Sequence, residues 1–285
     1  MGIINTNIIE DSFVKKDASK YNLSILIGMD RFSYAILDDE NHLLALKSYL
    51  INADLKASKK LHPALQDIFL EDEVLKLPFQ KKTVGFINHK TTFVPNKFYQ
   101  VEEVDTYLSK QVGSLETDQI FVDEIELMKA KNVYAFDQEV YFLVKGYLPN
   151  ARFVHNATSV LQGFSSNQNG SSGKKVYVNV KGDHLQIALF DNQEMVFYNT
   201  FAFQNEQDFI YQVMLVFNQF GLSTDSNPVI LSGQITKDSK IYRILFRYIN
   251  KIQFSKTPSA IQLGGNYQGI PTHFFFDLFS LGLCE

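Results

Sequence analysis

The chain has 285 residues, of which 45% are hydrophobic and 20% charged, and its formal net charge is −4. This is the composition of a soluble globular protein, and its charge gives no reason to expect nucleic acid or an anionic membrane as a partner. The single cysteine, Cys284, excludes a disulfide framework and a cysteine-based metal cluster. Residues 1–20 lack a signal-peptide pattern, and no apolar run is long enough for a transmembrane segment, so we expect a cytoplasmic protein.

The first half of the chain is predicted to follow an N-terminal extension, residues 1–21. Short polar turns separate three apolar segments, and strands joined by such turns must run antiparallel. A helix and a fourth strand follow, and then an insertion of about residues 91–128 that contains another helix. The expected elements are strands at 23–29, 32–37 and 42–51, a helix at 60–69, a strand at 82–88 and the helix of the insertion at 102–110.

Beyond the insertion the pattern predicts a strand, a helix and a strand, at residues 132–136, 137–145 and 151–155. A β–α–β unit of this kind should be parallel and right-handed. Residues 165–174 are rich in Ser, Gly and Asn and have almost no apolar content, which is typical of a linker. We therefore expect the first half to cover residues 22–164 and the second to cover residues 175–285.

The second half is predicted to repeat the element order of the first. The expected elements are strands at 176–180, 185–190 and 195–203, a helix at 206–220, and a strand, helix and strand at 229–232, 237–248 and 251–255. The final segment, residues 272–283, is aromatic and amphipathic. It is either a helix packed against the second sheet or a surface of which part binds a partner protein.

Residues 23–50 and 176–203 share one pattern when they are superposed without a gap. The identical pairs, at a constant offset of 153 residues, are Asp30 with Asp183, Ala35 with Ala188 and Asp38 with Asp191. Apolar positions coincide as well. The sequence therefore predicts an internal duplication, in which each half is a three-stranded meander followed by alternating helices and strands.

This duplicated arrangement resembles the ribonuclease H-like core of the actin and sugar-kinase superfamily, over about residues 22–283. Among its branches the chain is most similar to the FtsA and PilM types. More narrowly, residues 92–95, 153–156 and 271–285 resemble a Bacteroidetes-type family of uncharacterised proteins with an actin-like ATPase fold. The resemblance implies an α/β fold of two ribonuclease H-like halves, each a mixed sheet with flanking helices, that face each other across a cleft.

Catalytic members of that superfamily end the first strand of each half in an aspartate, followed by glycine and a hydroxyl residue. The resemblance places this aspartate near Ile27 and near Val180, which are both aliphatic. Asp30 and Asp183 come about three residues later, where they either stabilise the hairpin turn or contribute to a divergent nucleotide site. Gly233 stands at the adenosine motif, where it either contacts a nucleotide or makes an ordinary turn.

Other motifs give weaker signals. Residues 170–174 (GSSGK) have the wrong glycine spacing for a phosphate loop and precede a strand, and Gly264-Gly265 lies in a loop typical of a connection. No two histidines are spaced as metal ligands. His155 is the best histidine for a functional role, although a packed structural residue is the commoner case. Cys284 has no activating neighbour in the sequence, so nucleophilic catalysis is not predicted.

Taken together, the residues favour a non-catalytic scaffold or adaptor that binds an unknown protein partner, without a metal or a cofactor. No catalytic residues are predicted, because both family aspartates are replaced. The alternative is an actin-like ATPase or kinase that binds ATP and Mg²⁺ at a rearranged site formed by Asp30, Asp183 and Gly233. A site for some other small ligand in the expected cleft is a third hypothesis.

Overall fold

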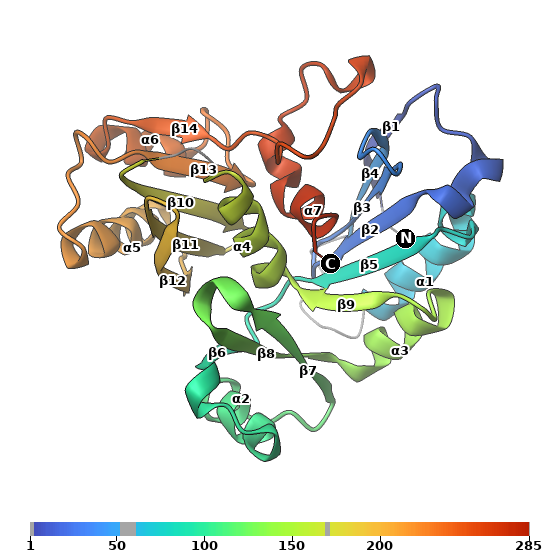
Figure 1. The fold of residues 1–285 in the computed structure, drawn as a ribbon, viewed down its shortest axis with the longest axis horizontal. Helices are drawn as coiled ribbons and strands as arrows, with labels where there is room; N and C mark the ends of the chain where they lie inside the picture. The colour runs from blue at the N-terminus through green and yellow to red at the C-terminus, as the bar shows by residue number, and fades with distance from the viewer. Residues whose placement is uncertain (1–2, 52–60, 169–171, 285) are drawn as a thin grey trace. The chain divides into compact units, whose positions relative to one another are not determined.

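A computed structural model describes residues 3–51, 61–168 and 172–284 of the chain (Figure 1). The chain divides into two compact units. Unit 1 consists of Met1–Ser159, Ala260–Ile270 and Leu278–Glu285, and unit 2 of Val160–Ser259 and Pro271–Asp277. Unit 1 therefore includes two segments, residues 260–270 and 278–285, that the sequence assigns to the second half.

Unit 1 contains a six-stranded mixed sheet in the order β1-β4-β3-β2-β5-β9. Its strands are β1 (Ile3–Ile9), β2 (Asn22–Ile27), β3 (Arg31–Leu37), β4 (Leu43–Leu50), β5 (Lys81–Phe86) and β9 (Arg152–His155). The neighbours from β1 to β2 are antiparallel, as the short turns predict, whereas β5 runs parallel to β2 and β9 runs parallel to β5. Strand β1 pairs with β4 at the sheet edge, although the sequence assigns these residues to an N-terminal extension that precedes the first half.

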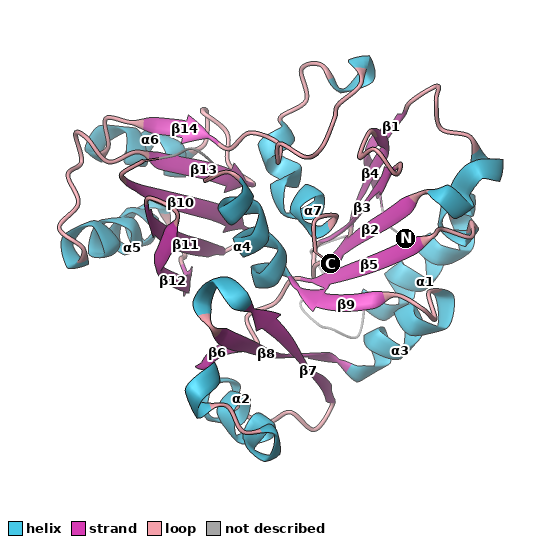
Figure 2. Ribbon diagram, in the orientation of Figure 1, coloured by secondary structure: helices cyan, strands magenta, loops and turns pink. Residues whose placement is uncertain are grey.

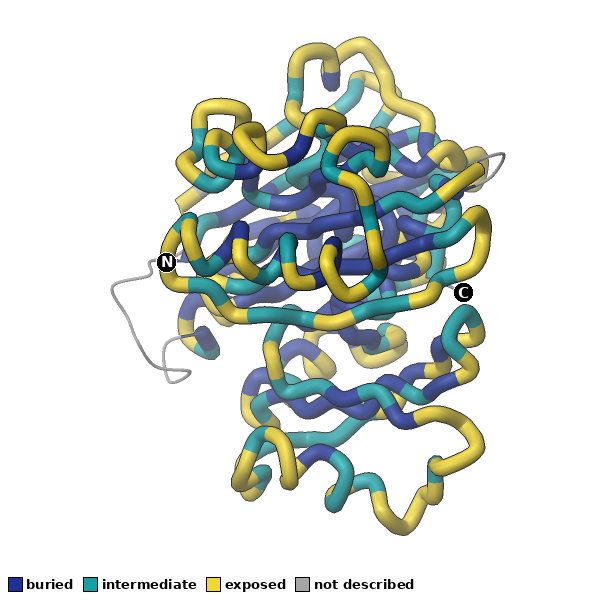
Figure 3. The backbone as a smooth tube through the Cα atoms, turned by 90° about the vertical axis from the view of Figure 1, so that its left-hand side faces the viewer, coloured by how far each residue is buried: buried dark blue, intermediate teal, exposed yellow. Residues whose placement is uncertain are grey.

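Helices α1 (Leu61–Glu71) and α3 (Gln138–Tyr147) pack on one face of this sheet (Figure 2). Alternate residues of the strands, such as Ile25, Ile27 and Phe32, point to these helices and are buried. The burial colours of Figure 3 show this contrast between dark strands and exposed loops. The short 3-10 helices of unit 1 are η1 (Lys15–Lys20), η3 (Glu73–Lys76), η4 (Asn96–Phe98), η5 (Val101–Glu103), η6 (Glu126–Met128) and η7 (Gly265–Tyr267).

The insertion forms a separate three-stranded antiparallel sheet in the order β6-β8-β7, with helix α2 packed on it. Its elements are β6 (Thr91–Pro95), α2 (Val104–Val112), β7 (Asp118–Ile125) and β8 (Ala130–Asp137). The expected parallel unit of the first half is therefore wrong, because β8 pairs along its length with β6 and β7 instead of joining β9. The parallel neighbour of β9 is β5.

Unit 2 contains a five-stranded sheet in the order β12-β11-β10-β13-β14, which repeats the order β4-β3-β2-β5-β9 of the first sheet. Its elements are β10 (Lys174–Lys181), β11 (His184–Asp191), β12 (Glu194–Ala202), α5 (Glu206–Gln219), β13 (Val229–Gly233), α6 (Lys240–Tyr248) and β14 (Ile252–Phe254). Strands β13 and β14 are parallel, as predicted for the second half. Both α5 and α6 pack on one face of the sheet, where they share a core with residues such as Val178 and Leu231.

Helix α4 (Asn156–Ser166) extends two residues into the expected linker, and β10 already begins at Lys174. Residues 169–171, which include part of the rejected phosphate-loop motif, lie outside the described residues. The segment that connects α4 to β10 is therefore residues 167–173, which is shorter than the linker of residues 165–174 that the composition predicts.

For residues 272–283 the sequence predicts either a helix packed against the second sheet or a surface of which part binds a partner protein, and the structure agrees with the first alternative only for the beginning of the segment. The 3-10 helix η8 (Thr272–Phe275) contacts β13, but helix α7 (Phe276–Leu281) ends in unit 1. There Leu281 lies where a side chain at Gly85 would be, 3.2 Å from an ideal Cβ, and Gly282 lies against Leu37. The missing side chain at Gly85 makes room for Leu281, and the sequence pattern of the final segment alone does not reveal this.

Candidate functional site

In an open α/β sheet, ligands bind beyond the carboxyl ends of the parallel strands. In unit 1 these ends are formed by Ile27, Phe86 and His155, which lie next to one another in register. Ile27 is fully buried in the core. The fold therefore places an aliphatic side chain, and no carboxylate, at the end of the first parallel strand.

In the turn after β2, the backbone carbonyl of Asp30 accepts a hydrogen bond. The amide of Gly28 donates to the carbonyl of Arg31 over 2.8 Å, and the amide of Ile51 donates to the carbonyl of Asp30 over 2.7 Å. The Asp30 side chain is on an exposed residue at this edge of the sheet. Its backbone carbonyl thus closes the turn, while its carboxylate faces solvent.

Unit 2 repeats this arrangement at the end of β10. Val180 is buried, and the amide of Phe203 donates to the carbonyl of Asp183 over 2.8 Å, which matches the bond from Ile51 to Asp30. The Asp183 side chain is 81% exposed and its Oδ1 lies 2.6 Å from Nδ1 of His184. The two aspartates therefore occupy equivalent turn positions in the two units.

Gly233 is constrained by the backbone of the neighbouring strand. Its φ is +80°, and a Cβ atom there would lie 2.1 Å from the carbonyl oxygen of Val180. That carbonyl accepts a hydrogen bond from the amide of Gln234 over 2.8 Å. Only glycine fits at this end of β13, where Gly233 pairs with Val180 of the parallel strand β10, so the packing of the sheet itself accounts for the residue.

Next to Val180, Lys181 forms an ion pair that sequence reasoning missed. Its Nζ lies 2.7 Å from Oδ2 of Asp277, with side chains that are 12% and 1% exposed. Asp277 comes from the C-terminal segment, nearly a hundred residues along the chain, so no local pattern reveals the pair. A lysine at the end of this strand is a natural ligand for phosphate, but here a buried carboxylate of the same unit already neutralises it.

A buried polar network surrounds Asn179, which lies two residues before Lys181 and therefore on the same face of β10. Asn179 donates through Nδ2 to Oε1 of Gln186 over 2.8 Å and accepts at Oδ1 from the hydroxyl of Ser232 over 3.0 Å. All three side chains are buried. Since these groups satisfy one another, the network fixes the sheet and leaves few hydrogen-bonding groups for a ligand.

His155 lies in a second polar cluster, in unit 1. Its Nδ1 accepts from the amide of Ala157 over 3.1 Å, so its Nε2 carries the proton and donates to the carbonyl of Asn88 over 3.2 Å. Complete burial lowers the pKa of His155 to about 4. The ring is therefore neutral near pH 7, and both of its nitrogens have backbone partners. These contacts are those of a packed structural histidine.

The carboxylate of Asp123 organises the same cluster. It accepts from the Thr158 hydroxyl over 2.6 Å, the backbone amide of His155 over 2.8 Å and the Tyr134 hydroxyl over 3.3 Å. Burial raises the pKa of Asp123 despite these donors. Burial also raises the pKa of the Cys284 thiol to about 12, so that cysteine is protonated and is not a nucleophile.

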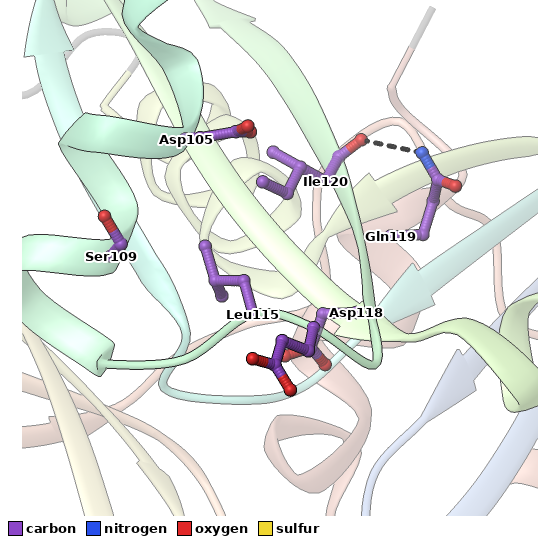
Figure 4. A pocket seen from close by; sticks show the side chains of 7 residues that line it. Asp105, Ser109, Leu115, Asp118, Gln119 and Ile120 are labelled. Carbon is purple, nitrogen blue, oxygen red and sulfur yellow. Dashed lines mark hydrogen bonds between the residues drawn. The ribbon is translucent and has the colours of Figure 1, made fainter.

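The small sheet carries a solvent-open hollow of about 420 Å³ between α2 and β7 (Figure 4). Asp105 and Ser109 of α2 line one side, and Asp118 and Ile120 line the other. Asp118 is bound by Nζ of Lys90 at 2.5 Å. The hollow is therefore an acidic surface depression whose most buried carboxylate is already paired.

Two further kinds of feature are not found in the part of the chain that the structure describes. No three His, Cys, Asp or Glu residues within it come together as metal ligands. No helix within it is both long and apolar enough to cross a membrane.

Gly264 lies against the carboxylate of Glu10, and the amide of Asn266 donates to that carboxylate over 3.3 Å, so the Gly264-Gly265 loop packs against β1.

The chain matches a family described as "Protein of unknown function (DUF3822)" over residues 10–252. No curated protein matches it in sequence. A solved protein from Bacteroides thetaiotaomicron, described as having an actin-like ATPase fold and unknown function, is similar in structure with a TM-score of 0.78. It is 18% identical, and the match covers 96% of this chain and 99% of that one.

Two further solved structures share the fold. One is the PilM–PilN type IV pilus biogenesis complex, with a TM-score of 0.60, 14% identity, and coverage of 92% of this chain and 97% of that chain. The other is the ethanolamine utilization protein EutJ from Carboxydothermus hydrogenoformans, with a TM-score of 0.51, 8% identity, and coverage of 92% and 89%. These similarities confirm the actin-like ATPase fold that the sequence predicts.

Proposed function

Because the chain belongs to the DUF3822 family and has the actin-like ATPase fold, we propose that it is a non-enzymatic scaffold or adaptor that binds other proteins. The observation that carries this proposal is the replacement of both strand-end carboxylates by buried aliphatic residues, Ile27 and Val180. Phosphoryl transfer requires groups that position Mg²⁺ and water against the phosphates, and an aliphatic side chain cannot do so.

The neighbouring residues support the same conclusion. Asp30 and Asp183 lie about three residues beyond the strand-end positions, in turns that their backbone carbonyls help to close, and Lys181 is neutralised by Asp277. Gly233 is explained by its contact with the Val180 carbonyl. These residues do not fit the Mg²⁺–nucleotide site of the fold's catalytic members, and we propose that the phosphate site is degenerate in both halves of an internal duplication.

A role in protein binding has precedent in this fold, since one similar structure is a complex formed for type IV pilus biogenesis. That complex concerns other proteins, and the similarity of 14% identity carries only the fold. We propose that this chain, too, acts in a protein assembly, in the cytoplasm and in association with the cell envelope.

Calorimetric titration of the protein with ATP in the presence of Mg²⁺ tests the proposal. We expect no binding heat in the micromolar range and no phosphate in the solution after incubation. Micromolar binding accompanied by phosphate release would refute the non-enzymatic function, whatever protein partner is found.

The alternative is an ATPase or kinase with a divergent site, and the exposed carboxylates of Asp30 and Asp183 at equivalent strand ends are the observation that favours it. The double substitution Asp30→Ala with Asp183→Ala separates the two proposals. If nucleotide binding disappears while the unfolding midpoint is unchanged, the residues are ligands. If only the midpoint falls, they are turn residues.

A further inference from the structure

The outward face of α6 in unit 2 combines three cations with an exposed aromatic ring. Lys240, Arg243 and Arg247 are all exposed, and their spacing of three and four residues places them along one ridge of the helix. Phe246, beside them, is 64% exposed. None of these three cations forms an ion pair with a described residue, so their charges face solvent.

Positive charge is concentrated in this part of the chain. Residues 237–256 contain six Lys or Arg residues and a single acid, Asp238, and so carry a formal charge of +5 in a chain of net charge −4. The nearby Asp225 accepts a hydrogen bond from Asn250 over 2.6 Å. Because salt screens charges beyond about 10 Å, a small ligand at this ridge experiences the local positive field and not the net negative charge.

An aromatic row connects the ridge with the edge of the sheet. Phe246 stacks on Tyr242 with ring centroids 6.3 Å apart and planes inclined by 15°, and Tyr242 stacks on Phe254 of β14 at 5.7 Å. Figure 1 shows α6 beside β14, which is the last strand in the order of its sheet. The stacking orders the Phe246 ring beside the ridge of cations, where its exposed surface offers an apolar contact.

We propose that this basic–aromatic surface, formed by Lys240, Arg243, Phe246 and Arg247, binds an acidic segment of a partner protein that carries an apolar residue. Carboxylates of the segment form bidentate hydrogen bonds with Arg243 and Arg247, and its apolar side chain packs on Phe246. The inference rests on the proposed scaffold function and names the chemistry of its partner.

Charge favours a short acidic segment over a nucleic acid or an anionic membrane. Outside residues 237–256 the chain carries a formal charge of −9, which repels an extended polyanion or a charged plane but acts weakly on a peptide that covers only the ridge.

The test uses the full chain and a fluorescein-labelled synthetic peptide of alternating glutamate and leucine, with binding followed by fluorescence anisotropy. We expect saturable binding that weakens as salt concentration rises. The double substitution Arg243→Glu with Arg247→Glu should weaken it at least about tenfold, and Phe246→Ser should weaken it severalfold with little effect on the salt dependence. These residues are exposed, so thermal unfolding should be unchanged.

The matched control is Lys15→Glu with Lys16→Glu, which makes the same change in net charge at exposed residues of unit 1 and should leave binding intact. Equal losses in the two double variants, or equal binding of a lysine–leucine peptide, would overturn the proposal. An absence of binding to the glutamate–leucine peptide would also overturn it. The same holds if the protein binds phosphatidylserine vesicles or a single-stranded oligonucleotide more tightly than the peptide, and if that binding depends on Arg243 and Arg247. Each of these failures leaves the scaffold function untouched, because only nucleotide turnover refutes that function.

Discussion

The ion pair between Lys181, at the end of β10, and Asp277 allows a quantitative test of the claim that these residues stabilise the fold and do not bind a ligand. At their separation of 2.7 Å, an effective dielectric constant of about 20 gives an attraction of roughly 6 kcal/mol, part of which offsets the desolvation of the two charges. Removing one partner leaves a buried charge without its counterion. We therefore expect Lys181→Met and Asp277→Asn each to lower the free energy of unfolding by about 3 kcal/mol.

Urea unfolding followed by far-ultraviolet circular dichroism measures these losses. The double variant should be much closer to the wild type than the sum of the single losses, because both charges are then removed. Lys76→Met, at the exposed pair of Lys76 with Glu73, should have no measurable effect. If Lys181→Met leaves stability unchanged while Asp277→Asn lowers it, Lys181 is not held by Asp277 and is available to bind an external anion.

Three further predictions concern residues whose contacts are now defined. Gly233→Ala should lower the free energy of unfolding by about 3 kcal/mol or more, because its Cβ would meet a backbone oxygen at 2.1 Å, whereas Gly265→Ala, with open space around it, should be nearly neutral in the same urea titration. The folded-state pKa of His155 is about 4, against an ordinary value of 6.5, so the unfolded chain binds the extra proton between these values. Stability should therefore fall by roughly 3 kcal/mol as the pH drops from 6.5 to 4, and His155→Gln should remove most of that dependence; an unchanged pH profile would contradict the neutral assignment. Tyr49→Phe should cost about 1–2 kcal/mol, because its hydroxyl donates to the buried carboxylate of Asp72 over 2.6 Å, and a loss within error in thermal unfolding would contradict that bond.

Local patterns in the sequence predict the strands of the two main sheets, except the edge strand β1, and the helices α1, α3, α5 and α6 that pack on them. The alternation of apolar residues predicts β2 and β3, and the short polar turns predict their antiparallel pairing. The superposition of Asp30 on Asp183 anticipated that both residues occupy equivalent turns, and the structure adds the matching backbone bonds from Ile51 and Phe203. These features depend on residues close together in the chain.

Features that depend on distant residues were not predictable in this way. Strand β8 has the pattern of a parallel-sheet strand, but it pairs with β6 and β7, and no local pattern in the sequence reveals that pairing. The Lys181–Asp277 pair and the Asp123 cluster each join segments that are far apart in the sequence. A single carboxylate in a sequence gives no sign of which buried donors will surround it, so these sites become visible only in the fold.

The central claim, that the chain retains an actin-like fold without its phosphate chemistry, is tested most directly by phosphate release from ATP. The assay uses the purified protein with Mg²⁺, and the Asp30→Ala, Asp183→Ala double variant serves as the matched blank. We predict that the wild type and the double variant release phosphate at the same background rate. Release by the wild type that exceeds the background and disappears in the double variant would contradict the claim.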